Sequence, residues 1–297
     1  MVQERISLSI IIPCLNTDDE KLKELLASID RQDFPKENLE VLVITEGTSE
    51  SAKAIGIRKA KGEIIGFLAS DNELIQKDLL SVMVRWAKEK GAAYPAQYFA
   101  SGNALNRYFA YIGGNDPLAL YMRKNDRYTH IIGYKPSTRG TIGDNGFFIK
   151  KSLIEKTDLD NYYHIDNAIE ATTDDDIIPC IAYAILHKTG GNIFSFFAKR
   201  YHYGLQHAFN KNRRWHLVDF RQPKDIARLL WFITASVLLV PTLCLSIRGY
   251  SRNQDVAWFM HPLVCLMTVF TYAILIIHLS ICRMCQSLSA PMDARRA

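Results

Sequence analysis

The sequence predicts an α/β domain built on a mostly parallel sheet, followed by two apolar helices at the C-terminus. The first observation is a set of three short apolar segments, at 7–16, 39–44 and 61–72, separated by stretches with helical periodicity. Strand, helix, strand, helix and strand within about 70 residues are typical of a parallel α/β sheet. The second observation is a pair of long segments, 229–247 and 256–281, that contain no Lys, Arg, Asp or Glu. Each is long enough to cross a bilayer, which takes about 20 apolar residues.

The helices between the predicted strands are indicated by their apolar spacing and by their ends. Residues 18–29 have acidic side chains in the first turn and leucines and isoleucines along one face. A second helix is expected over 51–60. A third is expected over 74–90, where Gly91 ends it. Because a helix after each strand returns the chain to the same side of the sheet, the strands are expected to run parallel.

The predicted strands end in polar residues. Asn16 follows the first strand, Glu46 the second and Asp71 the third. The carboxyl ends of parallel strands meet at one edge of the sheet, and open α/β sheets bind their ligands at that edge. Asp71 is therefore a candidate ligand for a divalent cation, although an Asp after a strand is also a common turn residue.

Four short motifs follow one another in the N-terminal part of the chain. They are Pro-Cys-Leu-Asn at 13–16, Thr-Glu-Gly-Thr-Ser-Glu at 45–50, Ala-Lys-Ala-Ile-Gly at 52–56 and Phe-Leu-Ala-Ser-Asp-Asn at 67–72. Their types and order resemble the inverting family 2 glycosyltransferases of the GT-A fold. That family has Pro-x-x-Asn, Asp-Asp-Gly-Ser-x-Asp, Ala-Arg-Asn-x-Gly and Phe-Leu-Asp-Ala-Asp-Asp at these places. The resemblance covers about residues 6–205 and implies a mostly parallel sheet, flanked by helices, that binds a nucleotide-diphospho-sugar.

The resemblance also implies which residues bind the donor and a metal. The implied nucleotide-sugar residues are Pro13, Asn16, Glu46, Lys53, Ser70, Asp144 and Asn145. Asp71 would hold Mg²⁺ or Mn²⁺ on the diphosphate, with Ala69 in place of the family's first metal-motif Asp. A later residue is then needed as a further ligand. His202 occupies the position where many members have such a histidine, and a packed structural histidine between two tyrosines is the equal alternative.

The segment Gly-Asp-Asn-Gly at 143–146 resembles the family's glycine-containing turn ahead of a strand that runs to Lys150. Glycines at such a turn let the backbone approach a sugar closely. Asp144 and Asn145 would then hydrogen-bond sugar hydroxyls. An ordinary turn explains the same residues equally well.

Three consecutive carboxylates, Asp174, Asp175 and Asp176, precede an apolar segment at 181–187 that we expect to be a helix. Carboxylates at a helix N-terminus can act as caps. Family 2 enzymes, however, have their catalytic base here, and inversion requires a carboxylate near the acceptor hydroxyl. Asp175 is the preferred base, and Asp174 is the base if the motif is aligned one residue earlier. A last strand is expected at 194–197.

The C-terminal third predicts membrane attachment. We expect a catalytic domain over 1–205, a basic interfacial segment over 206–228, a transmembrane hairpin over 229–281 and a cytoplasmic tail over 282–297. Lys and Arg outnumber Asp and Glu ahead of the hairpin, which favours a catalytic domain on the cytoplasmic side of a multi-pass protein. The expected partners of the basic segment are membrane lipids rather than nucleic acid. The six scattered cysteines give no disulfide framework.

The sequence therefore predicts a membrane-anchored inverting glycosyltransferase that uses a divalent metal. Its expected partners are a nucleotide-sugar donor and a lipid-linked or glycan acceptor at the cytoplasmic leaflet. The first alternative is a catalytically inactive relative that serves as a membrane partner subunit. A nucleotidyltransferase is disfavoured, because residues 13–19 lack the glycine-rich basic loop that such enzymes use.

Overall fold

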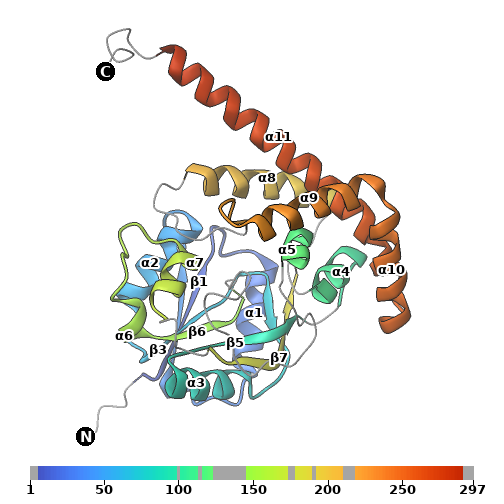
Figure 1. Ribbon diagram of the computed structural model, residues 1–297. Helices are drawn as coiled ribbons and strands as arrows, with labels where there is room; N and C mark the ends of the chain where they lie inside the picture. The colour runs from blue at the N-terminus through green and yellow to red at the C-terminus, as the bar shows by residue number, and fades with distance from the viewer. Residues whose placement is uncertain are drawn as a thin grey trace, which may run out of the picture.

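The computed structural model is a seven-stranded mixed sheet covered by helices, with a group of C-terminal helices packed at one end (Figure 1). The residues that it describes are 6–98, 101–112, 116–122, 145–172, 178–188, 192–209 and 218–289. The strand order is β2-β1-β3-β6-β5-β7-β4.

The N-terminal part confirms the predicted order of strands and helices. Strands β1 (Leu8–Pro13), β2 (Leu39–Ile44) and β3 (Ile64–Phe67) are parallel, with β1 in the centre, and helices α1 (Glu20–Asp30) and α2 (Ser49–Lys59) connect them. The helices begin at capping side chains: Asp19 accepts from the Lys21 N–H, and Thr48 forms a capping box with Ser51. Because these capping signals are local, the sequence pattern is sufficient to predict the order of strands and helices in this part of the chain.

The remaining strands extend the sheet with both orientations. They are β4 (Asn72–Leu74), β5 (Ala92–Tyr98), β6 (Phe147–Lys150) and β7 (Cys180–His187). The strand expected to run to Lys150 is confirmed as β6, which pairs antiparallel with β3 and β5. Strand β7 is parallel to β5 and antiparallel to β4. The predicted helix over 74–90 is shorter: α3 spans Leu79–Lys90 and ends at Gly91, whose φ is +87°.

Two predicted elements are wrong in type. The expected helix at 181–187 is strand β7, because this apolar run fills the place between β5 and β4; an apolar run of eight residues has no period that separates the two structures. The expected strand at 194–197 lies inside helix α8 (Ile193–Phe209). Asn192 accepts from the Ser195 N–H at 2.9 Å and so starts this helix, which buries Phe196 and Phe197 against α4 (Ala104–Ile112).

The C-terminal helices correct the predicted hairpin. Helices α9 (Pro223–Leu238) and α10 (Val240–Asn253) meet at Leu239, whose φ is +61°, and their axes differ by 88°. Pro241 has no N–H to donate to the preceding turn, so α9 cannot continue through it. Within the described residues one helical segment, Val256–Cys282, is by itself long and apolar enough to cross a membrane, and the bent pair α9 and α10 passes the same test only if the two helices count as one broken span. The segment Val256–Cys282 comprises the short η3 (Val256–Phe259) and most of α11 (Met260–Ser289).

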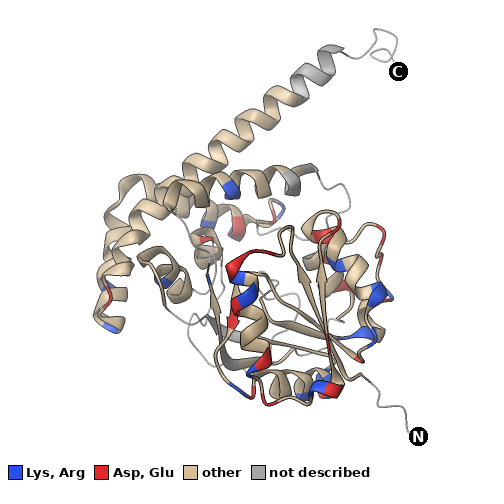
Figure 2. Ribbon diagram, turned by 180° about the vertical axis from the view of Figure 1, so that it is seen from behind, with Lys and Arg blue, Asp and Glu red and all other residues tan. Residues whose placement is uncertain are grey.

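Charged side chains are concentrated on the sheet domain, whereas α11 is almost free of them (Figure 2). The short helices α5 (Pro117–Met122), α6 (Lys151–Ile154) and α7 (His164–Glu170) complete the described structure. The sheet is buried on both faces, and a third apolar cluster joins α4, α8, η3 and α11. The domain and the C-terminal helices therefore share a packed interface.

Candidate functional site at the strand ends

The three parallel strands end within two residues of one another. Pro13 pairs with Ile44, Ile11 pairs with Phe67, and the Cys14 N–H donates to the Ile44 carbonyl at 3.0 Å. The residues that follow the strands therefore lie along one edge, as predicted from the parallel order. Of the predicted donor residues, Asn16 and Glu46 are exposed there, and Pro13 and Ser70 are partly buried.

Asp71 meets an imidazole that the sequence did not indicate. Its Oδ1 lies 3.2 Å from Nε2 of His187, the last residue of β7, and its side chain is 27 % exposed. The Lys188 N–H donates to the Asp71 carbonyl at 2.8 Å, so the backbone also ties these strand ends together. Burial alone would raise the pKa of the Asp71 carboxyl, but the hydrogen bond and charge of His187 and the charge of Lys21 outweigh it and lower this pKa. Asp71 is therefore an ionised carboxylate at neutral pH.

The turn before β6 brings Asn145 to the same place. Its Nδ2 lies 3.5 Å from Nδ1 of His187, at the outer limit of a hydrogen bond. The next residue, Gly146, donates its N–H to the Phe67 carbonyl at 2.9 Å and has a φ of +84°. A Cβ at Gly146 would lie 2.4 Å from Cδ1 of Ile185, so the glycine is needed for this close approach. Asp144 lies outside the described residues.

Lys53 has a different environment from the one predicted. Its side chain is 1 % exposed, and its ammonium lies 2.9 Å from Oε1 of Glu50. The other oxygen of Glu50 accepts from the His164 N–H at 2.7 Å. The pair therefore joins the first turn of α2 to α7 in the interior, and direct contact between Lys53 and a donor stays a prediction.

His202 and Asp71 are not joined by any contact of the described residues. His202 lies on α8 with its ring against that of Tyr201, at a centroid distance of 5.9 Å. No group of three or more His, Cys, Asp or Glu side chains in the described part of the chain is arranged to hold a metal ion. Asp71 and His187 offer one oxygen and one nitrogen donor. Such a pair suits Mg²⁺ or Mn²⁺ only where phosphate oxygens and water complete the shell.

The run Asp174–Asp176 also lies outside the described residues, but the chain on both sides is placed. Thr172 donates from its hydroxyl to the Ala168 carbonyl at the end of α7, and Ile178 is fully buried. Strand β7, and not a helix, follows the run. The capping explanation for the three carboxylates is therefore wrong, because β7 has no N-terminal turn to cap.

Sequence reasoning missed His187 and Lys21. His187 was assigned to the end of a helix, whereas a strand at 180–187 would have made it a strand-end residue like Asp71. The Lys21 ammonium donates to the Lys188 carbonyl at 3.0 Å and lies close enough to Asp71 to lower its pKa. A lysine in the first turn of a predicted helix gives no local signal of this kind.

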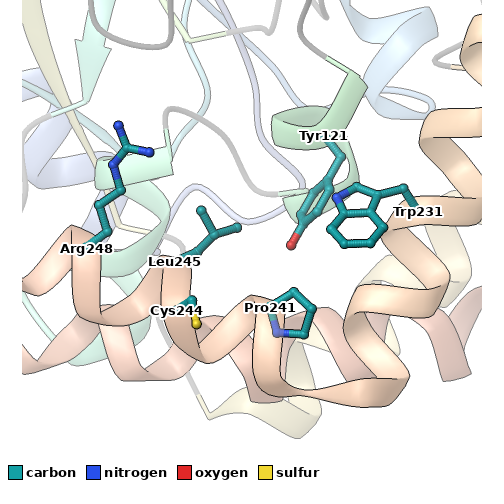
Figure 3. Close-up of a pocket in the computed structure, with 6 residues that line it drawn as sticks. All are labelled: Tyr121, Trp231, Pro241, Cys244, Leu245 and Arg248. Atoms are coloured by element: carbon teal, nitrogen blue, oxygen red, sulfur yellow. The ribbon is translucent and has the colours of Figure 1, made fainter.

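A cavity lies away from this edge, in the angle between α9 and α10 (Figure 3). It has a volume of about 400 Å³ and is lined by Tyr121, Trp231, Pro241, Cys244, Leu245 and Arg248. Its walls are mostly apolar, and Arg248 is at the end away from Trp231. This cavity contains none of the predicted site residues.

Comparison with known proteins gives a fold but no family. No protein-family model and no curated protein sequence matches the chain. The structure is similar to that of the mannosyltransferase PcManGT from Pyrobaculum calidifontis in complex with GDP-Man and Mn²⁺, with a TM-score of 0.51 and 13 % identity, over 90 % of this chain and 86 % of that one. Residues 1–349 of S. aureus TarS match with a TM-score of 0.44 and 15 % identity, over 87 % and 90 % of the two chains. The complex of TarS with UDP-GlcNAc matches with a TM-score of 0.42 and 16 % identity, over 87 % and 90 %. At such identities the first likeness shows the fold alone: this chain has the mixed α/β fold of a solved glycosyltransferase.

Proposed function

We propose that this protein is an inverting glycosyltransferase of the family 2 type, attached to a membrane, that transfers a sugar from a nucleotide-sugar to a lipid-linked or glycan acceptor. The observation that supports it most is that Asn16, Glu46 and Asp71 follow the neighbouring carboxyl ends of three parallel strands, with His187 beside Asp71. The shared fold with a mannosyltransferase is consistent with it.

The donor would lie along this edge. Asn16, Glu46, Ser70 and the turn at Pro13 would contact the nucleoside, and Asp144 and Asn145 the sugar. The ammonium of Lys21 is placed to meet a phosphate, since it lies beside Asp71 and donates only to a carbonyl in the contacts described. Lys53 would act through Glu50, by fixing the first turn of α2.

A divalent cation would bind between Asp71, His187 and the diphosphate. When bound, it would neutralise charge on the leaving nucleoside diphosphate. Asp71 is suited to this because its lowered pKa keeps it ionised, and His187 because its ring already faces the carboxylate.

Asp175 would act as the base, with Asp174 or Asp176 as its neighbours in the same run. It would accept the proton of the acceptor hydroxyl while the oxygen attacks the anomeric carbon from the face opposite the leaving diphosphate. Carboxylates that lie close together raise one another's pKa, which would favour proton transfer to one of the three near neutral pH.

Membrane attachment is supported by the exposed apolar side chains of α9, α10 and α11. We infer that the catalytic domain faces the cytoplasm, because basic residues precede these helices. An acceptor held in the membrane would then meet the strand ends from the cytoplasmic leaflet.

The test is a titration of the full-length protein in detergent with a panel of GDP- and UDP-sugars, with and without Mn²⁺. We expect binding of at least one donor, slow hydrolysis of it, and loss of the Mn²⁺-dependent part of the affinity in Asp71→Asn. Binding without any turnover would favour the alternative of an inactive membrane partner subunit, for which Ala69 is the supporting residue. Absence of both binding and hydrolysis would contradict the enzyme.

A further inference from the structure

Helix α11 has two faces of opposite character. The exposed apolar residues Leu263, Phe270, Ile274, Ile277 and Ile281 recur at spacings of seven, four, three and four, which places them along one side of the helix. The opposite side faces the protein. It contains His261, Cys265, Thr268, Thr271 and Tyr272, all of which are buried or partly buried.

The buried side of α11 is attached to the catalytic domain along most of its length. Near its start, Nδ1 of His261 lies 2.7 Å from the Tyr108 hydroxyl of α4. In its middle, the Tyr272 hydroxyl bonds to Asp116, which also pairs with Arg200 of α8. Further on, His278 bonds to the Tyr201 hydroxyl of α8. The contacts with the domain thus extend over the residues from 261 to 278.

The exposed side of α8 carries the polar residues Ser195, Lys199 and His202 beside the apolar Phe194 and Tyr203. The charge of Lys199 at this level disfavours contact of α8 with the hydrocarbon core of a bilayer. Residues of α11 that pack on α8 cannot also be surrounded by the bilayer. Among the contacts of the described side chains the last is that of His278, and residues 279–289 of the helix lie beyond it. At about 1.5 Å per residue they cover about 16 Å, whereas the hydrocarbon core is about 30 Å thick. In this arrangement α11 is too short beyond the domain to cross.

The connection between α10 and α11 is also held by the catalytic domain. Asp255 accepts from Nε of Arg107 at 2.7 Å and from the Tyr111 hydroxyl at 2.7 Å. The Trp258 ring stacks on that of Tyr111, at a centroid distance of 5.6 Å and an angle of 8°. Since Arg107 and Tyr111 belong to α4, this connection lies on the side of the membrane where the domain is.

Helices α9 and α10 expose apolar residues at their corner. Val237, Leu238, Leu239 and Val240 are consecutive and are each between 43 and 67 % exposed. Trp231 and Leu243 continue the exposed apolar surface on the two arms. Exposed cations lie at the outer ends of the arms and at the cavity between them: Arg221, Lys224, Arg248 and Arg252. Apolar side chains bordered by cations suit the boundary between acyl chains and anionic headgroups.

We propose that α9, α10 and α11 form one monotopic membrane-binding surface that enters a single leaflet of an anionic phospholipid bilayer and does not cross it. This rests on the proposed membrane attachment and changes its topology. The domain, the connection at Asp255 and the C-terminal tail are then all on one side. The ten Lys and Arg residues between 199 and 252 and the three arginines of the tail also share that side, in agreement with the positive-inside tendency.

The test is cysteine accessibility in the full-length protein, expressed in bacterial cells. Cys180, Cys244, Cys282 and Cys285 are replaced by Ala, and the buried Cys14 and Cys265 are kept. Single reporter cysteines are introduced as Lys77→Cys on the domain, Ser251→Cys on the connection and Ala294→Cys in the tail. A membrane-impermeant maleimide is applied to spheroplasts and to inverted vesicles. We expect all three reporters to react from the same side.

Other labelling patterns would overturn the proposal in distinguishable ways. If the cysteine of Ala294→Cys reacts from the opposite side of the membrane, α11 crosses the membrane. If only the cysteine of Ser251→Cys reacts from the opposite side, the C-terminal helices form the transmembrane hairpin that the sequence predicts. Release of the protein by a carbonate wash would contradict membrane attachment itself, and with it that part of the proposed function.

A second measurement locates the surface. The measurement is flotation with vesicles that contain anionic lipid. Val240→Lys and Ile277→Lys should each lower the ratio of bound to free protein at least tenfold. The control is Ile75→Lys, at an exposed residue next to β4 on the domain, which should leave this ratio unchanged. Dimers of the wild type that do not bind vesicles would assign the apolar face to a second copy of the chain and overturn the proposal.

Discussion

The polar edge of the sheet and the C-terminal helices are built in opposite ways. At the edge, the apolar residues of β1 and β3 are buried and those of β2 are buried or partly buried, whereas the polar side chains Asn16, Glu46 and Asp71 lie outward or partly outward. In the C-terminal helices, polar groups such as Asp255 and His261 face the domain and apolar residues are exposed. The difference is in accord with the proposal that the two regions contact different media. Water and a charged ligand favour the first arrangement, and hydrocarbon favours the second.

The largest expected effect concerns the polar edge and would show whether it is catalytic. Asp175→Asn removes the proposed base and should lower the rate of sugar transfer by about 10³-fold, with donor affinity unchanged. The rate is measured as release of nucleoside diphosphate, and affinity by calorimetry. Asp174→Asn is the matched control, with a smaller effect expected. If the order of the two variants is reversed, the base is Asp174.

The second prediction breaks the C-terminal interface. A Cβ at Gly249 would lie 2.1 Å from the Trp258 ring, which is held by Tyr111 and cannot move aside. Gly249→Ala should therefore lower the free energy of unfolding by about 3 kcal/mol. Thermal denaturation in detergent measures it, with Ser251→Ala on the same helix as control. Equal melting temperatures for the two variants would show that η3 is not packed on α10 as described.

The third prediction compares His187 at the polar edge with His202 on α8. His187→Ala should weaken Mn²⁺-dependent donor binding by about 10- to 100-fold, because its ring contacts Asp71. His202→Ala on α8 is the control and should have little effect, although the sequence offers His202 as a metal ligand and as a packed structural residue equally. A larger loss of Mn²⁺-dependent donor affinity in His202→Ala than in His187→Ala would identify His202 as the metal ligand. Calorimetric titration of donor with and without Mn²⁺ provides the comparison.

The smallest predicted effect depends on pH and tests the connection before η3. The hydrogen bond from Arg107 is the main cause that lowers the pKa of Asp255 from 3.8 to about 2. A carboxyl with a lowered pKa in the folded state stabilises the protein above the unfolded pKa, and this contribution is lost as the pH falls from about 4 towards 2. At neutral pH, Asp255→Asn should cost about 1 to 2 kcal/mol, which allows for solvent screening at this partly exposed pair.

The measurement for this pair is the difference in free energy of unfolding between the wild type and Asp255→Asn, at pH 6 and at pH 3. This difference in the free energy of unfolding should have its full value at pH 6 and a smaller value at pH 3. Asp30→Asn, which removes an exposed pair with Lys36, is the control and should show almost no difference at either pH. A difference for Asp255→Asn that does not change with pH would contradict the ionic contribution.

Much of the polar edge was predictable because its signals are local. The strand before Pro13, the capping residues Asp19 and Thr48 and the acid after β3 are all visible within a few residues of sequence. His187 was not predictable in the same way. Its role depends on β7 pairing with β5 and β4, which lie about 90 to 115 residues earlier in the chain. The run at 180–187 is apolar throughout and gives no period from which to choose strand over helix.

By itself, the sequence determined the parallel β1–β2–β3 unit, the polar edge at its carboxyl end and the strongly apolar composition of the C-terminal third, because each follows from short-range patterns of burial and capping. Only the tertiary structure decided which residues meet at that edge and what the apolar helices do. Composition measures how apolar a segment is but not what it packs against. The 88° corner at Leu239 follows from Pro241 two residues later, whereas the attachment of α11 to α8 through His278 arises from a contact distant in sequence. In the proposed topology, this contact is what distinguishes lying on a membrane from spanning it.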